Sequence, residues 1–546
     1  MKYLRWFLRA VRPYRLALTG MLFCHLCLAA CTVGFVYVCK ALVDAAVAAV
    51  NGQGPEEGSI AFFFGMLVTV ILSRIILNAA RTYLQTKTDI RLKNGLRRRL
   101  FDVLLRMQSD GGKSHHSGDI LNRIQEDVRV VSNAFAISLP NIIGAALQFT
   151  VAFIFLLILD LRLGIVILVV LPVGMLVGKF ITGRVKNLTL DVRSRDSKVQ
   201  EHLQESIQHR TLLKSLEYTQ ATSDSLGDLQ DTLYSSEIRR TKFSVISRIF
   251  VSLAFQTGYV VAFMRGVLGI SHGTVTYGMM TAFLQLVGQI QRPLLEMSSY
   301  VPSIIHAMAS VDRIMEIEAL PCEEYEEPVQ LAAPAGIRME DVTFAYPDSA
   351  DAVLEGFSHD FAPGSRTAIV GPTGVGKSTM IRLLMALLEP QAGEIRIYDR
   401  MSGDEKVSSA VRCNMVYVPQ GNSLFSGTIR DNLLMGNPEA SEQQMWDALD
   451  TAAAGFVSDM PHGLDTQCFE AGAGLSEGQA QRIAIARALL RPGSILLLDE
   501  FSSALDAETE ILLMNRLTSR LSDRTMIFIT HREKIIDYCT DTLRLG

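Results

Sequence analysis

The pattern of hydrophobic positions divides the chain into two unlike halves. In the first half, apolar stretches alternate with charged segments, and each stretch has about the 20 residues that a helix needs to cross a bilayer. We expect six membrane-spanning helices, at residues 16–43, 60–80, 137–159, 163–181, 243–270 and 279–305. The fifth and sixth stretches are less uniformly apolar than the others, so their limits are less sharply defined.

The basic residues between these stretches predict their orientation. Five Lys and Arg residues precede the first stretch, and none lies between residues 41 and 58, before the second. Because cytoplasmic connections carry the basic excess, the N-terminus is expected in the cytoplasm, and an even number of spans returns the second half there. The long connections 81–136 and 182–242 read as charged helices that continue the spans beyond the bilayer. We therefore expect an integral protein of the cell membrane, a bacterial plasma membrane.

The overall composition hides this division. Hydrophobic residues make up 49%, charged residues 20%, and the net charge is −4, which excludes a disordered chain and a polybasic nucleic-acid binder. Residues 1–320 carry a net charge of +11 and residues 321–546 a net charge of −15. We place a transmembrane domain at 1–318, a linker with a proline-flanked acidic segment at 319–336 and an α/β domain at 337–546.

Polar side chains inside the last two spans are costly and therefore informative. Gln285, Gln289, Gln291 and Arg292 cluster in the sixth span, and Arg265 lies near the outer end of the fifth. Two interpretations stay open from the sequence. The side chains line a water-filled substrate path, or the glutamines bond between helices while Arg265 extends to the membrane surface.

A phosphate-binding loop stands between a predicted strand, 366–370, and a predicted helix. Its residues are Gly371, Pro372, Thr373, Gly374, Val375, Gly376, Lys377, Ser378 and Thr379. Glycines in such a loop let backbone N–H groups turn toward phosphate oxygens, and the helix N-terminus adds its positive dipole end. Lys377 is expected to reach the β- and γ-phosphates of ATP, and Ser378 to hold Mg²⁺.

Two adjacent carboxylates follow a second apolar run, residues 494–498. Asp499 is expected at the carboxyl end of a parallel strand, where ligands bind in open α/β sheets, and can hold Mg²⁺. Glu500 is then placed to act as general base on an attacking water. An acidic pair in a solvated loop is the alternative, which the phosphate loop disfavours.

With these motifs the chain resembles an ATP-binding cassette (ABC) exporter half-transporter over nearly its whole length. Residues 475–479, LSEGQ, resemble the family signature LSGGQ and contain Ser476, Gly478 and Gln479. The resemblance assigns adenine stacking to Tyr346, a place beside Mg²⁺ and water to Gln420, and contact with the γ-phosphate to His531. Asp506 matches the loop after the catalytic glutamate, and Glu470 matches an acidic residue of exporters. Residues 117–123, 127–128 and 208–217 resemble the coupling regions.

The resemblance implies a fold, a cofactor set and a partner. The fold is an all-α transmembrane domain of six helices followed by an α/β P-loop nucleotide-binding domain. The cofactors are ATP and Mg²⁺, and a second half-transporter subunit, in a homodimer or a heterodimer, completes each ATP site. The activity is ATP-driven export or flipping of a lipid, a hydrophobic drug or a peptide.

One departure from the family keeps alternatives open. Glu477 stands where the signature usually has glycine. Its carboxylate either points to solvent and complements the helix dipole, or weakens one ATP site of a heterodimeric exporter. An ATP-gated receptor or channel is the alternative from another class. Glu500, His531 and Gln420 together favour turnover over gating.

Overall fold

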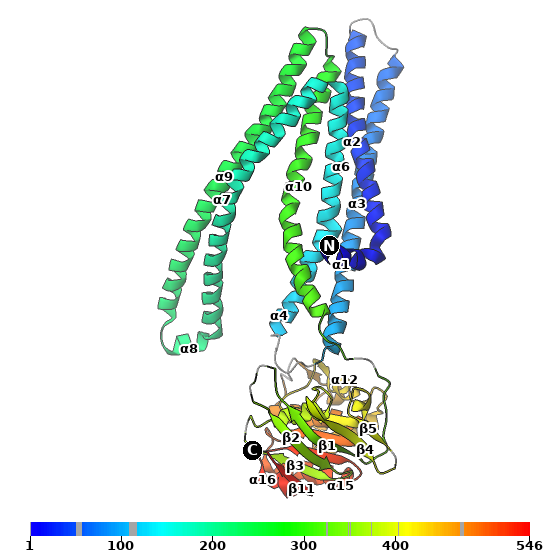
Figure 1. The fold of residues 1–546 in the computed structure, drawn as a ribbon, viewed down its shortest axis with the longest axis vertical. Coiled ribbons are helices and arrows are strands. Elements are labelled where there is room, and N and C mark those ends of the chain that lie inside the picture. Colours follow the sequence, from blue (N-terminus) through cyan, green and yellow to red (C-terminus); the bar gives the residue numbers. More distant parts are fainter. Residues whose placement is uncertain are drawn as a thin grey trace. The chain divides into compact units, whose positions relative to one another are not determined.

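The computed structural model describes residues 2–50, 57–108, 117–323, 326–347, 349, 351–372, 374–401, 403–469 and 474–545. Side chains of residues 4, 57–58, 117–119 and 170–182 lie outside this description. Thr373 and Glu470 therefore also lie outside the described residues. The chain forms two compact units (Figure 1), one of residues 1–101 and 121–316 and the other of residues 102–120 and 317–546.

Long helices build the first unit. They are α1 (Lys2–Val11), α2 (Arg15–Val50), α3 (Glu57–Arg106), α4 (Ser117–Asn122), α5 (Val128–Asn133), α6 (Leu139–Leu159), α7 (Leu161–Gln208), α8 (Arg210–Ser215), α9 (Thr219–Ser271) and α10 (Tyr277–Glu318). The longest, α9, has 53 residues and so extends about 80 Å, well beyond a bilayer of about 30 Å. Several spans thus continue as helix, as their charged extensions predicted.

Among the described residues, four helical stretches are long and apolar enough to cross a membrane: Arg5–Val50, Ser59–Arg106, Ile120–Leu159 and Thr219–Ser271. The fourth predicted span falls in α7, whose side chains at 170–182 are outside the description. The sixth predicted span lies in α10, which carries glutamine, arginine and glutamate and does not reach the same apolar average. Six spans remain a prediction.

A buried apolar core joins the helices of the first unit. Phe283, Leu286 and Ile290 of α10 are fully buried with Leu156 of α6 and Ala262 of α9. The helices α7 and α9 run side by side and are joined through the short helix α8 (Figure 1). The i, i+3/i+4 spacing of the buried α10 residues is the apolar stripe that fixes the rotation of this helix.

The second unit contains two main sheets. An antiparallel sheet has the order β2-β1-β4-β5, and a sheet of parallel neighbours has the order β11-β3-β10-β9-β6. The strands are β1 (Ala335–Phe344), β2 (Leu354–Phe361), β3 (Arg366–Val370), β4 (Ala392–Asp399), β5 (Asp404–Lys406), β6 (Met415–Val418), β9 (Ile495–Asp499), β10 (Thr525–Ile529) and β11 (Asp541–Arg544), with a short β7–β8 pair at Gly427–Thr428 and Gln467–Cys468. The first strand begins two residues before the predicted start of the α/β domain.

Helices cover both faces of the parallel sheet. They are α11 (Lys377–Leu384), α12 (Ile429–Leu434), α13 (Glu442–Thr451), α14 (Glu477–Leu489), α15 (Ala507–Arg520) and α16 (Glu533–Ile536). Alternate residues of β9 enter two cores: Ile495 and Leu497 pack with α11 and the antiparallel sheet, and Leu496 and Leu498 with the helices that follow β6. Burial on both faces explains the unbroken apolar run of this strand.

Candidate nucleotide-binding site

The order of the parallel strands gathers the candidate site residues at one edge. The phosphate loop follows β3, Asp499 ends β9, His531 lies two residues after β10, and Gln420 lies two residues after β6. These strands are neighbours in the order β3-β10-β9-β6. Since parallel strands end at the same edge of their sheet, residues separated by up to 160 positions meet there.

The phosphate loop depends on glycine for its backbone shape and close packing. Gly374 and Gly376 have φ angles of +89° and +106°, a region that side-chain-bearing residues rarely adopt. A Cβ on Gly376 would lie 2.4 Å from Val353 Cγ1, and one on Gly371 would lie 2.4 Å from the carbonyl oxygen of Leu545. The loop then enters α11, for which Gly376 is the N-cap.

Lys377 is held inside this loop and is 7% exposed. Its Nζ donates to the carbonyl oxygens of Gly371 at 2.6 Å and Pro372 at 3.1 Å, and lies 3.0 Å from Nε2 of His531. Burial lowers the pKa of Lys377, while the carboxylates of Glu500 and Asp499 act in the opposite direction. The ammonium group is thus positioned and desolvated inside the loop that is predicted to bind phosphate.

Asp499 is a buried carboxylate, 4% exposed, at the end of β9. Burial raises its pKa, the charge of Glu500 raises it further, and hydrogen bonding from Tyr417 and Ser378 opposes the shift. The hydroxyl of Tyr417 donates to Asp499 Oδ2 at 3.4 Å, and burial with this carboxylate raises the pKa of Tyr417 to about 12. A carboxyl group this poorly solvated is suited to a cation.

The donor set at this edge fits Mg²⁺. The hydroxyl of Ser378, the carboxylate of Asp499 and the amide oxygen of Gln420 are the oxygen ligands that Mg²⁺ prefers, and Mg²⁺ usually keeps water and substrate phosphate in its remaining positions. Burial and the neighbouring charge of Glu500 raise the pKa of Asp499. A divalent cation would offset both effects, because it would stabilise the two adjacent carboxylates.

Glu500 is held between two side chains. Gln420 Nε2 donates to one carboxylate oxygen at 2.6 Å, and His531 Nε2 lies 3.3 Å from the other. The backbone of Glu500 has φ +43°, a strained value for a residue with a side chain, and its N–H donates to Ile529 at 3.0 Å. Gln481 Nε2 donates to the Glu500 carbonyl at 3.3 Å.

Tyr346 lies beside the phosphate loop. It follows β1, its hydroxyl is 2.9 Å from Thr379 Oγ1, and its ring meets the Phe344 ring edge to face at 5.1 Å. The structure therefore brings Tyr346 together with α11. Stacking of its ring on adenine stays a prediction.

The signature segment forms the start of α14. Ser476 and Gln479 make a capping box in which each side chain bonds the other's backbone N–H, at 3.2 and 2.9 Å. Glu477 is exposed in the first turn. Gly478 allows close packing, because a Cβ there would lie 2.7 Å from the carbonyl oxygen of Ala504. Among the described residues, the hydrogen bonds of Ser476 and Gln479 stay within this turn.

Asp506 has a local structural role that the motif did not indicate. Its carboxylate accepts from Thr509 N at 3.0 Å and caps α15, which lowers the pKa of Asp506. Arg532 fixes the same loop by donating to the carbonyls of Ser503 at 3.0 Å and Leu505 at 3.2 Å, and it pairs with the buried Glu510 at 3.0 Å. No sequence motif indicated Arg532, although it directly follows His531.

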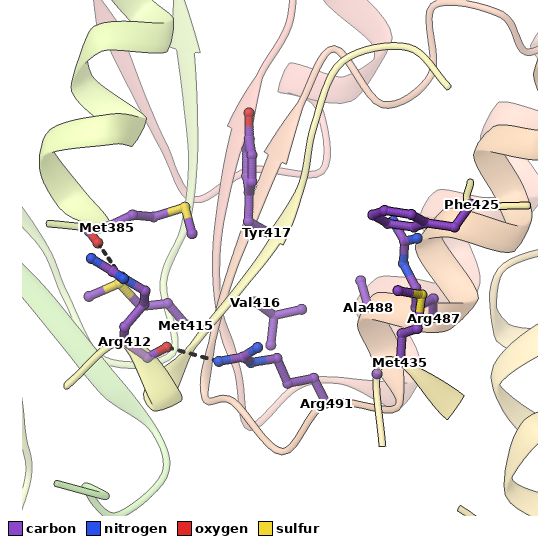
Figure 2. Close-up of a pocket in the computed structure, with 11 residues that line it drawn as sticks. Met385, Arg412, Met415, Val416, Tyr417, Phe425, Met435, Arg487, Ala488 and Arg491 are labelled. Atoms are coloured by element: carbon purple, nitrogen blue, oxygen red, sulfur yellow. Dashed lines mark hydrogen bonds between the residues drawn. The ribbon is translucent and has the colours of Figure 1, made fainter. Parts of the chain in front are cut away.

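Tyr417 also lines a separate cavity of about 240 Å³ (Figure 2). Figure 2 shows the Tyr417 ring between the Met385 and Arg412 side and the Phe425 and Arg487 side of this cavity. Arg487 donates to Ser423 Oγ at 2.7 Å. No sequence motif indicated Tyr417, which reaches Asp499 only because β6 and β9 are neighbouring strands.

Hydrogen bonds and an ion pair explain the positions of some of the polar residues of α9 and α10. Gln148 Nε2 donates to Gln289 Oε1 at 2.9 Å, and Gln291 Nε2 donates to the Phe255 carbonyl at 2.9 Å, so both glutamines bond between helices. Arg265 forms an ion pair with Asp160 at 2.8 Å. This ion pair explains the position of Arg265 without extension of its side chain to the membrane surface. Gln289 also lines a cavity, described below.

These observations define the class of protein as a membrane-embedded helical unit fused to a phosphate-loop ATP-binding unit. Family comparison agrees with it. The ABC transporter transmembrane region matches residues 18–294, and the ABC transporter ATP-binding family matches residues 354–503. The chain belongs to the ABC transporter family, as an exporter-type half-transporter in which both domains are fused, and it is an ATP-hydrolysing transporter. The predicted order of a helical transmembrane region followed by a nucleotide-binding domain is thereby confirmed.

Relatives and a solved structure extend this result. A fatty acid ABC transporter ATP-binding/permease protein of Mycobacterium bovis is 27% identical over 88% of this chain and 76% of its own length. The ABC multidrug transporter mdr2 of Aspergillus fumigatus is 29% identical over 89% of this chain and 62% of its own length. The structure of a bacterial Atm1-family ABC exporter with ATP bound shares the fold, with TM-score 0.79 and 23% identity over 97% of this chain and 93% of that one.

Proposed function

We propose that this chain works as a dimer in the cell membrane and exports or flips a lipid, a hydrophobic drug or a peptide, with ATP and Mg²⁺ bound between paired nucleotide-binding domains. The observation that carries the proposal is the Glu500 carboxylate, held between Gln420 and His531 beside the buried Lys377. A nucleotide-gated channel needs no such positioned base, whereas a pump that must reset after each cycle does.

The roles of the residues follow from their positions. The phosphate loop and Lys377 bind the β- and γ-phosphates, and Ser378, Asp499 and Gln420 would hold Mg²⁺, which would supply charge neutralisation at the phosphates. Glu500 orients a water and takes its proton, while His531 contacts the γ-phosphate. Tyr346 provides an aromatic surface for adenine.

The signature segment explains the need for a second subunit. Ser476, Gly478 and Gln479 stand at the N-terminus of α14, where the helix dipole attracts anions. In a dimer this end of one subunit closes over the ATP of the other, and Asp506 shapes the neighbouring loop. ATP stabilises the closed dimer, hydrolysis and product release reopen it, and the spans alternate between inward- and outward-facing states.

A heterodimer with one weak site is the second candidate, favoured by one observation, the carboxylate of Glu477 in the signature. Its exposure and its place in the first turn of α14 fit a role in complementing the helix dipole instead. A purified homodimer that hydrolyses ATP at two equivalent sites would exclude the heterodimer requirement.

The test of the proposed function is ATP hydrolysis and substrate uptake in proteoliposomes, with Glu500→Gln as the variant. We expect this variant to bind ATP and to lose turnover by about 10²- to 10⁴-fold, the usual contribution of a general base. Glu439→Gln, at an exposed glutamate, is the matched control and should keep full activity. Near-normal turnover of Glu500→Gln would refute the assigned role, and uptake supported equally by a non-hydrolysable ATP analogue would favour a channel.

A further inference from the structure

The helical unit has an open polar cavity between four of its helices. The cavity has a volume of about 760 Å³ and is lined by α2, α3, α6 and α10. Arg74 and Arg81 of α3, Gln148 of α6, and Gln285 and Gln289 of α10 are among its polar lining residues. Cavities of this size hold small organic molecules.

The positive charge of this cavity is not balanced by its own carboxylate. Arg292 pairs with Glu296 at 3.0 Å, and both line the cavity. Within the part of the chain that the structure describes, neither Arg74 nor Arg81 forms an ion pair. Arg74 stacks over the Phe35 ring at 5.5 Å, and Arg81 donates to Asn78 at 2.8 Å, while its buried Nε has no hydrogen-bond partner among the described residues.

The two arginines share one face of α3. They are seven residues apart, which is two helical turns or about 10 Å along the axis, with Asn78 between them. Arg74 lies inside an apolar stretch long enough to cross the membrane. An arginine at such a place is costly unless it faces water, a partner charge or a ligand, and its planar group suits bidentate binding of a carboxylate or phosphate.

The other lining residues supply two further kinds of contact. Leu28, Ile71, Ile75 and Leu284 give the cavity an apolar wall. The amides of Gln148 and Gln289 already bond to each other, whereas the buried Oε1 of Gln285 accepts no hydrogen bond from the described residues. The lining therefore combines two arginines that form no ion pair with the described residues, amide groups and an apolar surface.

We infer that the cargo of this transporter is an amphipathic anion, whose negatively charged group binds Arg74 and Arg81 while its apolar part lies against α2 and α3. This inference rests on the proposed function and adds the substrate class. The negative group is a carboxylate or a phosphate, and a free amphiphile and an anionic lipid of the bilayer are its two sources.

The experiment uses the full-length chain in nanodiscs of phosphatidylcholine and measures binding and ATPase stimulation. The probes share one twelve-carbon chain: dodecanoate, dodecyl phosphate, methyl dodecanoate and dodecyltrimethylammonium, all below their micelle concentrations. We expect dodecanoate or dodecyl phosphate to bind at least 10-fold more tightly than the neutral ester and the cation. Parallel nanodiscs with phosphatidylglycerol assign the source, because an anionic lipid cargo would stimulate ATPase without any added probe.

Variants test whether Arg74 and Arg81 cause the selectivity for anions. Arg74→Gln/Arg81→Gln should weaken anion binding by 10-fold or more and abolish anion stimulation, and Arg74→Lys/Arg81→Lys should restore part of both. Arg239→Gln, at an exposed arginine of α9, is the matched control and should bind as the parent does. Equal binding of all four probes, or unchanged anion binding by the double glutamine variant, would overturn the inference.

Unstimulated ATPase activity separates this inference from the proposed function. A chain that hydrolyses ATP through Glu500 but binds cation and anion alike keeps its role as a pump and loses only the substrate class. A chain without Glu500-dependent hydrolysis contradicts the proposed function whatever it binds.

Discussion

Gln420 and Glu500, 80 residues apart in sequence, are joined by a 2.6 Å hydrogen bond from the amide Nε2 to a carboxylate oxygen. The bond spans the ends of neighbouring strands β6 and β9. It fixes the rotamer of a glutamate whose backbone is already strained at φ +43°. Gln420 is thus a positioning residue for Glu500, besides its expected role near Mg²⁺.

Gln420→Ala should lower the maximal rate of ATP hydrolysis by about 10- to 100-fold, because a misplaced base loses much of its contribution. The KM for ATP should change less than the maximal rate, since the phosphate loop, Ser378 and Asp499 are untouched. Steady-state kinetics of the reconstituted chain measure both. Gln443→Ala, at an exposed glutamine of α13, is the control. A change in KM with an unchanged maximal rate would contradict the positioning role.

Lys377→Ala should remove the cation that the phosphate loop surrounds. We expect the Kd for ATP to rise at least about 10-fold, because a charge-assisted hydrogen bond contributes about 1.5–3 kcal/mol. Equilibrium binding of a fluorescent ATP analogue checks this, with Lys406→Ala at the exposed strand β5 as control. Unchanged nucleotide affinity would count against the phosphate-loop assignment.

Gly478→Ala should destabilise the second unit. The added Cβ would lie 2.7 Å from the carbonyl oxygen of Ala504, so backbone must move, at a cost of about 1–3 kcal/mol. Thermal unfolding of the purified chain measures the resulting decrease in unfolding temperature. Gly455→Ala is a matched control, since a Cβ there meets nothing within 4 Å. Equal unfolding temperatures for the two variants would show that the loop accommodates the methyl group.

Asp499→Asn should stabilise the nucleotide-free, Mg²⁺-free chain near pH 7.5. Burial raises the pKa of Asp499, so the folded state binds the proton more tightly than the unfolded state, and ionisation at neutral pH costs stability. That cost disappears as the pH falls through the folded-state pKa. The stability difference between variant and parent should therefore shrink as the pH falls from 7.5 toward about 4, the pKa of an ordinary aspartate.

Thermal unfolding across that pH range measures the effect, and each kcal/mol corresponds to about 2–4 °C in a domain of this size. Asp523→Asn, at an exposed aspartate, should show no comparable trend. A difference that grows as the pH falls would mean that Asp499 is stabilised as the anion, contrary to its burial. The same variant should bind ATP with a weakened dependence on Mg²⁺.

Local sequence was sufficient to predict an element and its role wherever one short segment decides both structure and chemistry. The strand at 366–370 and the glycines of the phosphate loop were readable because a β-branched run, a loop that needs positive φ and a helix stand in direct succession. The long helices were readable because apolar length is a local property. The predicted sixth span was not reproduced by the same apolar criterion, because α10 mixes polar side chains into its stripe.

What the sequence by itself determined is therefore the family, the ATP-binding loop and the existence of membrane helices. Only the tertiary structure decided how the distant site residues contact one another. Strand order brought Gln420, Glu500 and His531 together, and a helix cap gave Asp506 its local role. Packing of α2, α3, α6 and α10 placed Arg74 and Arg81 on a cavity. Such meetings depend on long-range packing, which no local pattern encodes.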